Sequence, residues 1–217
     1  ELSKLDFHWI RLHYLYPEVI TDVLIDEIAH EKKIVPYLDL PIQHASDAVL
    51  KRMGRRTTKQ ELIDIIEKLR REIPDICLRT TLITGFPGET EEQHEELIEF
   101  VDEMEFDRLG VFTYSPEEDT PAEKMPDQID EEVKEERQAE LMELQQEIAF
   151  DNAERMIGRE VLVMIEGKVA DENAYVGRTY RGAPNVDGLI FINTDGELLS
   201  GDFARVKVTG ALEYDLI

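Results

Sequence analysis

The chain has 217 residues, 42% hydrophobic and 34% charged, a balance typical of a soluble globular protein with one or two domains. Its 49 acidic residues outnumber 24 basic ones, and the net charge of −25 repels phosphate backbones and attracts basic proteins. An acid-rich proteome explains this charge equally well. No apolar run approaches the ~20 residues that span a bilayer, so we expect no membrane association.

The chain begins at Glu1 with no signal peptide, and we expect it to be a fragment of a longer protein. Cys77 is the sole cysteine, so the sequence predicts no internal disulfide and no metal held by this fragment. A cytoplasmic location fits this cysteine usage.

Strand and helix patterns alternate through the first part of the chain. Aromatic and β-branched residues predict a strand over 7–17, and further strands are predicted at 37–40, 76–83 and 109–114. The first strand is followed by a predicted helix, whose inner face should carry Val19, Ile20, Val23, Leu24 and Ile28.

Capping signals place the other helices. Ser46 starts a short helix that Gly54 ends, and Thr58 with Glu61 and Thr90 with Gln93 form two capping boxes. The resulting alternation of strands and helices predicts an α/β fold with parallel strands, part of a (βα) barrel.

The second part of the chain changes pattern. A long acidic helix is predicted over 130–156, with Arg137 at a position where a coiled coil needs an apolar residue, so we expect a packed connecting helix. Its inward residues should be Val133, Leu141, Leu144 and Ile148. After Gly158, short strands separated by glycines predict a small antiparallel β-barrel. The expected domains are therefore 1–157 and 158–217.

Three motifs fall where predicted strands end, and the carboxyl ends of parallel strands form the active face of a barrel. They are PIQH at 41–44, GFPGET at 85–90 and TYSP at 113–116. The glycines of GFPGET allow a ligand close to the main chain just before a helix N-terminus. Tyr114 and Ser115 offer a flat apolar face beside polar groups, which suits a nucleobase, although ordinary packing explains them too.

Strand alternation assigns Arg79 and Thr81 to the barrel interior, because the opposite face of this strand is mostly apolar. A buried arginine needs an anionic partner, which is either a ligand carboxylate or an internal carboxylate such as Asp39. His13 fits a hydrogen-bonded core histidine better than a ligand or base. His8, His30 and His94 are expected on surface faces, with no metal-site spacing.

These motifs together, with ASDAVLKRMGR at 45–55 and VFTYSPEEDTPA at 111–122, resemble the radical S-adenosylmethionine (SAM) methylthiotransferases. The segment VGRTYRGAPNVDG at 176–188 resembles the TRAM domain of that family. Transfer-RNA-modifying members commonly carry Gln-Ser-Gly-Ser after the proline. Here Gln43-His44-Ala45-Ser46 resembles the RimO branch, whose members methylthiolate an aspartate of a small-subunit ribosomal protein.

The resemblance implies a partial barrel of six βα units, of which this chain holds the last four strands. It implies two [4Fe-4S] clusters in the full-length protein, bound by cysteines that this fragment lacks, so the isolated fragment should be inactive. It also implies S-adenosylmethionine as cofactor, with Gln43 at the ribose and Arg79 at the carboxylate. The cofactor-binding residues expected on this basis are Gln43, His44, Arg79, Thr81, Ile83, Gly85, Phe112, Tyr114 and Ser115.

The implied reaction is methylthiolation of an aspartate β-carbon in small-subunit ribosomal protein twelve, a basic partner that suits the acidic surface. Nucleic acid is then an unfavourable partner. Two alternatives remain open, a transfer-RNA methylthiotransferase of the same superfamily and a non-enzymatic acidic scaffold that binds a basic protein.

Overall fold

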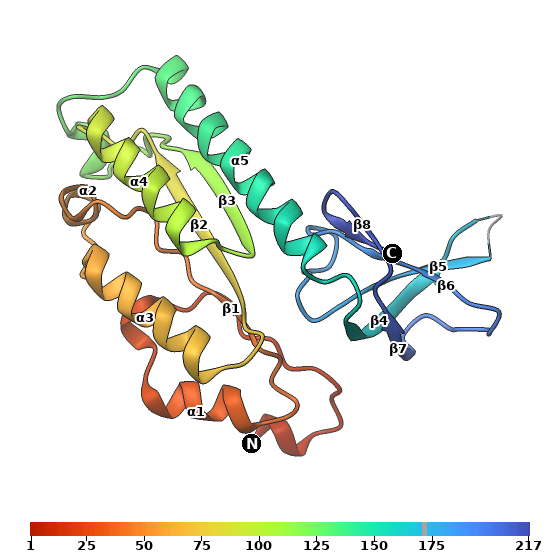
Figure 1. Cartoon of the computed structure of the whole chain (residues 1–217). Helices are drawn as coiled ribbons and strands as arrows, with labels where there is room; N and C mark the ends of the chain where they lie inside the picture. Colours follow the sequence, from red (N-terminus) through yellow and green to blue (C-terminus); the bar gives the residue numbers. More distant parts are fainter. Residues whose placement is uncertain (171–172) are drawn as a thin grey trace. The chain divides into compact units, whose positions relative to one another are not determined.

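The computed structural model describes residues 1–170 and 173–217, which form two compact units, Glu1–Gln146 and Glu147–Ile217. The division falls inside the long helix α5, Glu131–Glu154, which is drawn in green to teal in Figure 1.

The first unit is built on a parallel three-stranded sheet with the order β1-β2-β3. Its strands are β1 (Tyr37–Asp39), β2 (Cys77–Thr84) and β3 (Arg108–Thr113). The connections carry α2 (Asp47–Arg52), α3 (Lys59–Glu72) and α4 (Glu91–Met104), and α1 (Asp22–His30) precedes β1. Figure 1 shows α3 and α4 alongside the sheet, as expected for βαβ crossovers.

The two predicted capping boxes are confirmed. The Thr58 hydroxyl accepts the Glu61 N–H while the Glu61 carboxylate accepts the Thr58 N–H, and Thr90 and Gln93 repeat this arrangement. These contacts satisfy amide groups that a helix start leaves without partners. They fix the points where the chain enters α3 and α4.

The predicted strand over 7–17 is wrong. The segment makes one isolated bridge, Ile10 to Ile34, and its Leu15 N–H donates to the Asp39 carbonyl. Tyr14 lies between these points with φ 55, which interrupts the extended conformation that a ladder needs. Strand propensity alone did not give this segment a regular ladder.

The helix predicted after Pro17 is shifted. Pro17–Val19 form a short 3-10 helix, and α1 begins only after Thr21, whose side chain caps it. The buried residues are Ile25 and Ile28, whereas Val23 is exposed. The predicted inner face was therefore only partly correct.

Helix α5 covers the free edge of β3. Gln138 Nε2 donates to the Val111 carbonyl at 2.6 Å, and Gln145 Nε2 donates to the Phe106 carbonyl at 2.9 Å. These side chains satisfy carbonyls at a sheet edge that would otherwise invite another strand. The buried residues of α5 are Lys134, Arg137, Leu141, Gln145, Ile148 and Ala149, so only part of the predicted apolar set is correct.

The second unit contains a six-stranded sheet with the order β7-β4-β5-β6-β9-β8, in which all pairs are antiparallel except β6 with β9. The strands are β4 (Glu160–Lys168), β5 (Ala174–Arg178), β6 (Ile190–Asn193), β7 (Phe203–Lys207), β8 (Ala211–Leu212) and β9 (Asp215–Leu216). Its core includes Val163, Ile165, Tyr175, Ile190 and Val208. The first four strands were predicted, whereas the two-residue strands β8 and β9 were not.

Within the described residues, the structure contains no helix with the length and hydrophobicity needed to cross a membrane.

Gly177 should be a stability determinant of the second unit. A Cβ there would lie 2.5 Å from Val163 Cγ1 and 2.6 Å from the Met164 carbonyl oxygen, so Gly177→Ala forces β4 and β5 apart. We expect a loss of about 1–3 kcal/mol in the free energy of unfolding, the scale of overpacking. Gly167→Ala is the matched control, because a Cβ at Gly167 meets nothing within 4 Å. Urea denaturation measures both, and equal stability of the two variants would contradict the close approach.

Candidate functional site

The sheet of the first unit has one packed face and one open face. In β2, Leu78, Thr80, Leu82 and Thr84 are buried, whereas Arg79, Thr81 and Ile83 are only partly buried. This alternation confirms the predicted division of the strand. The open face therefore carries the polar and exposed side chains that are available to a ligand.

The register with β3 extends this open face into three rows. Arg79 pairs with Arg108, Thr81 pairs with Gly110, and Ile83 pairs with Phe112. Because paired residues of parallel neighbours point the same way, each row presents both side chains on one face. A Cβ at Gly110 would meet only the Phe112 ring, at 3.9 Å, so the middle row leaves space for a molecule to approach the main chain.

The arginine row is anchored on β1. Asp39, which is buried, pairs with Arg79 in the register, and the ring of Tyr37 lies 4.2 Å beneath the Arg11 guanidinium. Burial raises the pKa of the Tyr37 hydroxyl to about 12, and the charge of Arg79 works against that rise. One end of the open face is therefore rich in cationic groups.

Gln43 joins the open face through its backbone. Its N–H donates to the Thr81 carbonyl at 3.0 Å, and its carbonyl accepts the Ile83 N–H at 2.8 Å. Gln43 has φ 75, a backbone conformation that is energetically unfavourable for a residue other than glycine. The motif PIQH thus lies against the carboxyl end of β2, as predicted.

The GFPGET loop is folded around a buried carboxylate. Glu89 Oε2 accepts the N–H groups of Gly85 and Phe86 at 2.9 and 3.2 Å, and the Glu89 side chain is inaccessible to solvent. Gly85 has φ +71, and a Cβ there would overlap Lys134 Cγ, so only glycine fits. The loop is therefore held by its own glutamate.

Two further groups meet Glu89. Arg137 Nη1 donates to Glu89 Oε1 at 2.9 Å, and His44 Nε2 lies 3.5 Å from Glu89 Oε2. The Ser46 N–H donates to His44 Nδ1 at 2.9 Å, so the Nε2 side of the ring faces the carboxylate. Burial raises the pKa of the Glu89 carboxyl, but His44, Arg137 and the Phe86 N–H together bring that pKa below its usual value.

Tyr114 lies in a small apolar cluster under the loop. Its ring packs edge-on against Phe86, with the ring centroids 5.2 Å apart, and Val49 and Ile83 belong to the same cluster. The Tyr114 N–H donates to the Thr84 carbonyl, which continues the sheet beyond β3. Ser115 and Phe112 remain exposed.

The structure thus brings the predicted residues to one sheet edge in two groups. Arg79, Thr81, Ile83 and Phe112 line the open face with Gln43 beside them, whereas His44, Gly85 and Tyr114 are buried supports. His94, expected on the surface, is buried, and its Nε2 lies 2.7 Å from Glu140 Oε2. That expectation was wrong because the ring points from α4 toward α5.

Sequence reasoning missed the roles of five residues in this region. Gly110 and Arg108 follow from the alternation of β3, which could have been applied as it was to β2. Glu89 was placed at the rim without a role, and Arg137 and Lys134 interrupt the apolar pattern of α5. A charged residue at an inward position of a helix was the sequence signal that could have identified Arg137 and Lys134.

Comparisons with known proteins support the fold. A family model of the radical SAM superfamily matches residues 1–101, and a TRAM domain model matches residues 157–217. Coproporphyrinogen III oxidase (HemN) from Escherichia coli, described as a radical SAM enzyme, has a similar fold with a TM-score of 0.50 at 14% identity. The match covers 79% of this chain and 46% of that chain, and it supports the fold alone.

Curated relatives are much more similar in sequence. The ribosomal protein uS12 methylthiotransferase RimO of Lachnoclostridium phytofermentans is 65% identical over 209 residues, which is 96% of this chain and 48% of the relative. The protein of the same name from Clostridium botulinum (strain Langeland) is 53% identical over 218 residues, 100% of this chain and 48% of the relative. The chain therefore spans about half the length of these relatives.

The buried carboxylate predicts a specific acid sensitivity. Because the pKa of Glu89 is lowered in the native state, its contribution to stability is present above its unfolded pKa of about 4.3 and is lost as pH falls through the native value. Glu89→Gln should lower the free energy of unfolding at pH 7 by about 3 kcal/mol or more, the cost of breaking a buried ion pair.

The difference between wild type and Glu89→Gln should shrink as the pH is lowered below about 4, since protonated glutamate resembles glutamine. Urea denaturation at a series of pH values measures it. Glu91→Gln is the control, because that carboxylate also meets Arg137 but its side chain is 65% exposed. A difference that stays constant with pH would show that Glu89 is not the titrating group.

Proposed function

Because the chain belongs to the radical SAM methylthiotransferases of the RimO type, we propose that it supplies the cofactor-binding sheet and the TRAM domain of an enzyme that methylthiolates an aspartate β-carbon of ribosomal protein uS12. The single observation that carries the proposal is the three-row open face, joined to two buried loops at the carboxyl ends of β2 and β3. Its proposed place of action is the cytoplasm, where ribosomal proteins are assembled.

We propose that S-adenosylmethionine lies across the three rows. Arg79 and Arg108 with Asp39 form a row of net positive charge, which suits the carboxylate of the cofactor. The open space at Gly110 accommodates the middle part of S-adenosylmethionine. Ile83 and Phe112 present an apolar surface for its adenine. Gln43 lies at the ribose, held by its backbone bonds to β2.

Bound S-adenosylmethionine, together with iron–sulfur clusters, supplies the radical and sulfur-transfer chemistry of this family. Two [4Fe-4S] clusters are proposed for the whole protein. Cys77 is the sole cysteine of these 217 residues and is buried in β2, so the cluster ligands would come from outside them. The residues of this chain bind and orient the cofactor, and the buried loop edge excludes water from the adenine side.

The proposed reaction is tested by a fusion in which this chain replaces the matching 209 residues of the L. phytofermentans relative. The anaerobically reconstituted fusion should methylthiolate uS12, as measured by mass spectrometry of the modified protein. In this fusion, Arg79→Ala should weaken S-adenosylmethionine binding by about 1.5–3 kcal/mol, the scale of a charge-assisted hydrogen bond.

Arg79→Lys should recover only part of the affinity, because lysine lacks the planar fork of donors. Arg71→Ala is the matched control, because that side chain lies on α3 and is 64% exposed. Calorimetric titration measures the three variants. Unchanged affinity in Arg79→Ala would make this arginine structural, and a fusion that does not modify uS12 would refute the proposed function.

The partner is inferred from charge. Residues 158–217 contain 6 basic and 10 acidic residues, and the remainder contains 18 and 39. Arg178 is paired with Glu166 at 2.8 Å, and Lys207 pairs across the sheet with Glu160, so the TRAM domain contains acidic neighbours for its cations. A domain that binds nucleic acid normally has a basic surface patch. The acidic composition here therefore favours a basic protein as partner.

We therefore expect this chain to bind uS12, with affinity that falls as salt rises, and to bind transfer RNA less tightly. Fluorescence anisotropy at low and moderate salt compares the two partners. Arg205→Glu combined with Lys207→Glu should leave uS12 binding unchanged or stronger. Tighter binding of transfer RNA than of uS12 would instead favour a transfer-RNA methylthiotransferase.

A further inference from the structure

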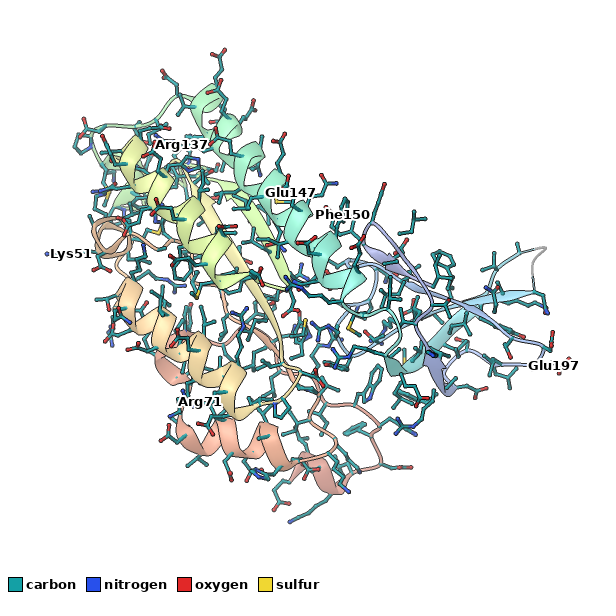
Figure 2. The ribbon with its side chains drawn as sticks, viewed as in Figure 1. Lys51, Arg71, Arg137, Glu147, Phe150 and Glu197 are labelled. Atoms are coloured by element: carbon teal, nitrogen blue, oxygen red, sulfur yellow. The ribbon has the colours of Figure 1, made fainter. Side chains whose placement is uncertain are left out.

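Helix α5 places two cations inside the first unit, one helical turn apart. Lys134 and Arg137 are 5% and 6% exposed, and Figure 2 shows Arg137 between α4 and α5. Burial of charged groups is costly unless hydrogen bonds compensate it. Their partners therefore show what these side chains hold in place.

Arg137 holds the GFPGET loop. It donates to both the Glu89 carboxylate and the Glu89 carbonyl, at 2.9 and 3.3 Å, and its second nitrogen reaches Glu91 Oε2 at 3.1 Å. Glu89 in turn accepts the N–H groups of Gly85 and Phe86. The guanidinium thus fixes the loop through one intermediate carboxylate.

Lys134 holds the segment after β3. Its Nζ donates to the Tyr114 carbonyl at 2.9 Å, and the Lys134 carbonyl accepts the Thr84 hydroxyl at 3.4 Å. The Lys134 side chain also fills the space in which a Cβ of Gly85 would lie. The two cations therefore converge on neighbouring segments at the carboxyl ends of β2 and β3.

An exclusively stabilising role is a poor explanation for this arrangement. Well-packed apolar residues of similar size often give a buried site equal or greater stability, so a buried ion pair is weak evidence for a stabilising role. What the cations add is directed hydrogen bonding to backbone groups of two loops. Such bonds fix a loop to within a fraction of an ångström, which ligand binding requires.

We propose that Arg137 and Lys134 are positioning residues, which use α5 to set the two loop segments that support the proposed adenosine site on the open face. This inference rests on the proposed function for the identity of the ligand. Neither residue contacts the open face; Arg137 acts through Glu89, and Lys134 acts through Tyr114 and Gly85.

The loop itself supplies the first test, which needs no cofactor. Hydrogen exchange of the 217-residue chain, followed by mass spectrometry, should show faster exchange over 84–90 in Arg137→Met by about tenfold, as expected when a charge-assisted contact is lost. Residues 77–83 report whether β2 remains folded. Glu140→Gln is the matched control, because it removes the charge from another contact between α5 and α4, at His94, without touching the loop.

Cofactor binding supplies the second test, in the fusion with the L. phytofermentans relative. Arg137→Met and Lys134→Met should each raise the Kd for S-adenosylmethionine by about tenfold, Arg137→Lys should restore part of the loss, and Glu140→Gln should change Kd less than about twofold. Lys134→Met and Arg137→Lys decide the question if Arg137→Met does not fold.

The outcomes separate the two proposals. If the wild-type fusion binds S-adenosylmethionine and the α5 variants bind it equally well, the positioning role is overturned and α5 only stabilises the unit. Equal losses in Glu140→Gln would overturn it too, because any contact between α5 and α4 would then suffice. If the wild-type fusion does not bind the cofactor, the proposed function and this inference both fail, while the exchange rates still report whether α5 holds the loop.

Discussion

The buried carboxylate of Glu89 is the contact on which the loop edge of the first unit depends. It accepts two amide groups of its own loop and one guanidinium from α5, and it faces the His44 ring. An isolated charge in this position would be prohibitive, so every partner must be present at once. One side chain therefore couples the segment after β1, the loop after β2 and a helix some 50 residues further along.

The sheet has one packed face and one open face, and the open face is the proposed binding surface. Leu78, Thr80 and Leu82 are buried, while Arg79, Thr81 and Ile83 remain on the open face with their partners on β3. Period-two alternation makes this division rigid, because a shift of one residue would turn the arginines into the core. The charged row, the glycine row and the apolar row follow from the register alone, and they provide three different environments along one molecule-sized surface.

Local signals in the sequence predicted much of this structure. The capping boxes of α3 and α4 and the alternation of β2 depend on near neighbours, and all three are confirmed. The failures involve contacts distant in sequence. The segment 7–17 has strand propensity but no regular ladder, and His94 is buried by α5. At the site, α5 buries a lysine and an arginine because their partners are loop backbone and Glu89, which no helical periodicity reveals.

The buried cations Lys134 and Arg137 also leave the surface more negatively charged. Only 24 residues of the chain are basic, and Lys134 and Arg137 are buried in ion pairs and backbone contacts. Arg79 and Arg108 are partly buried on the open face, where they form the proposed site for the cofactor carboxylate beside Asp39. The other 20 basic residues of the sequence are outnumbered by its 49 acidic residues. Long-range attraction acts through exposed charge, so this acidic excess supports the proposal of a basic protein as partner rather than nucleic acid.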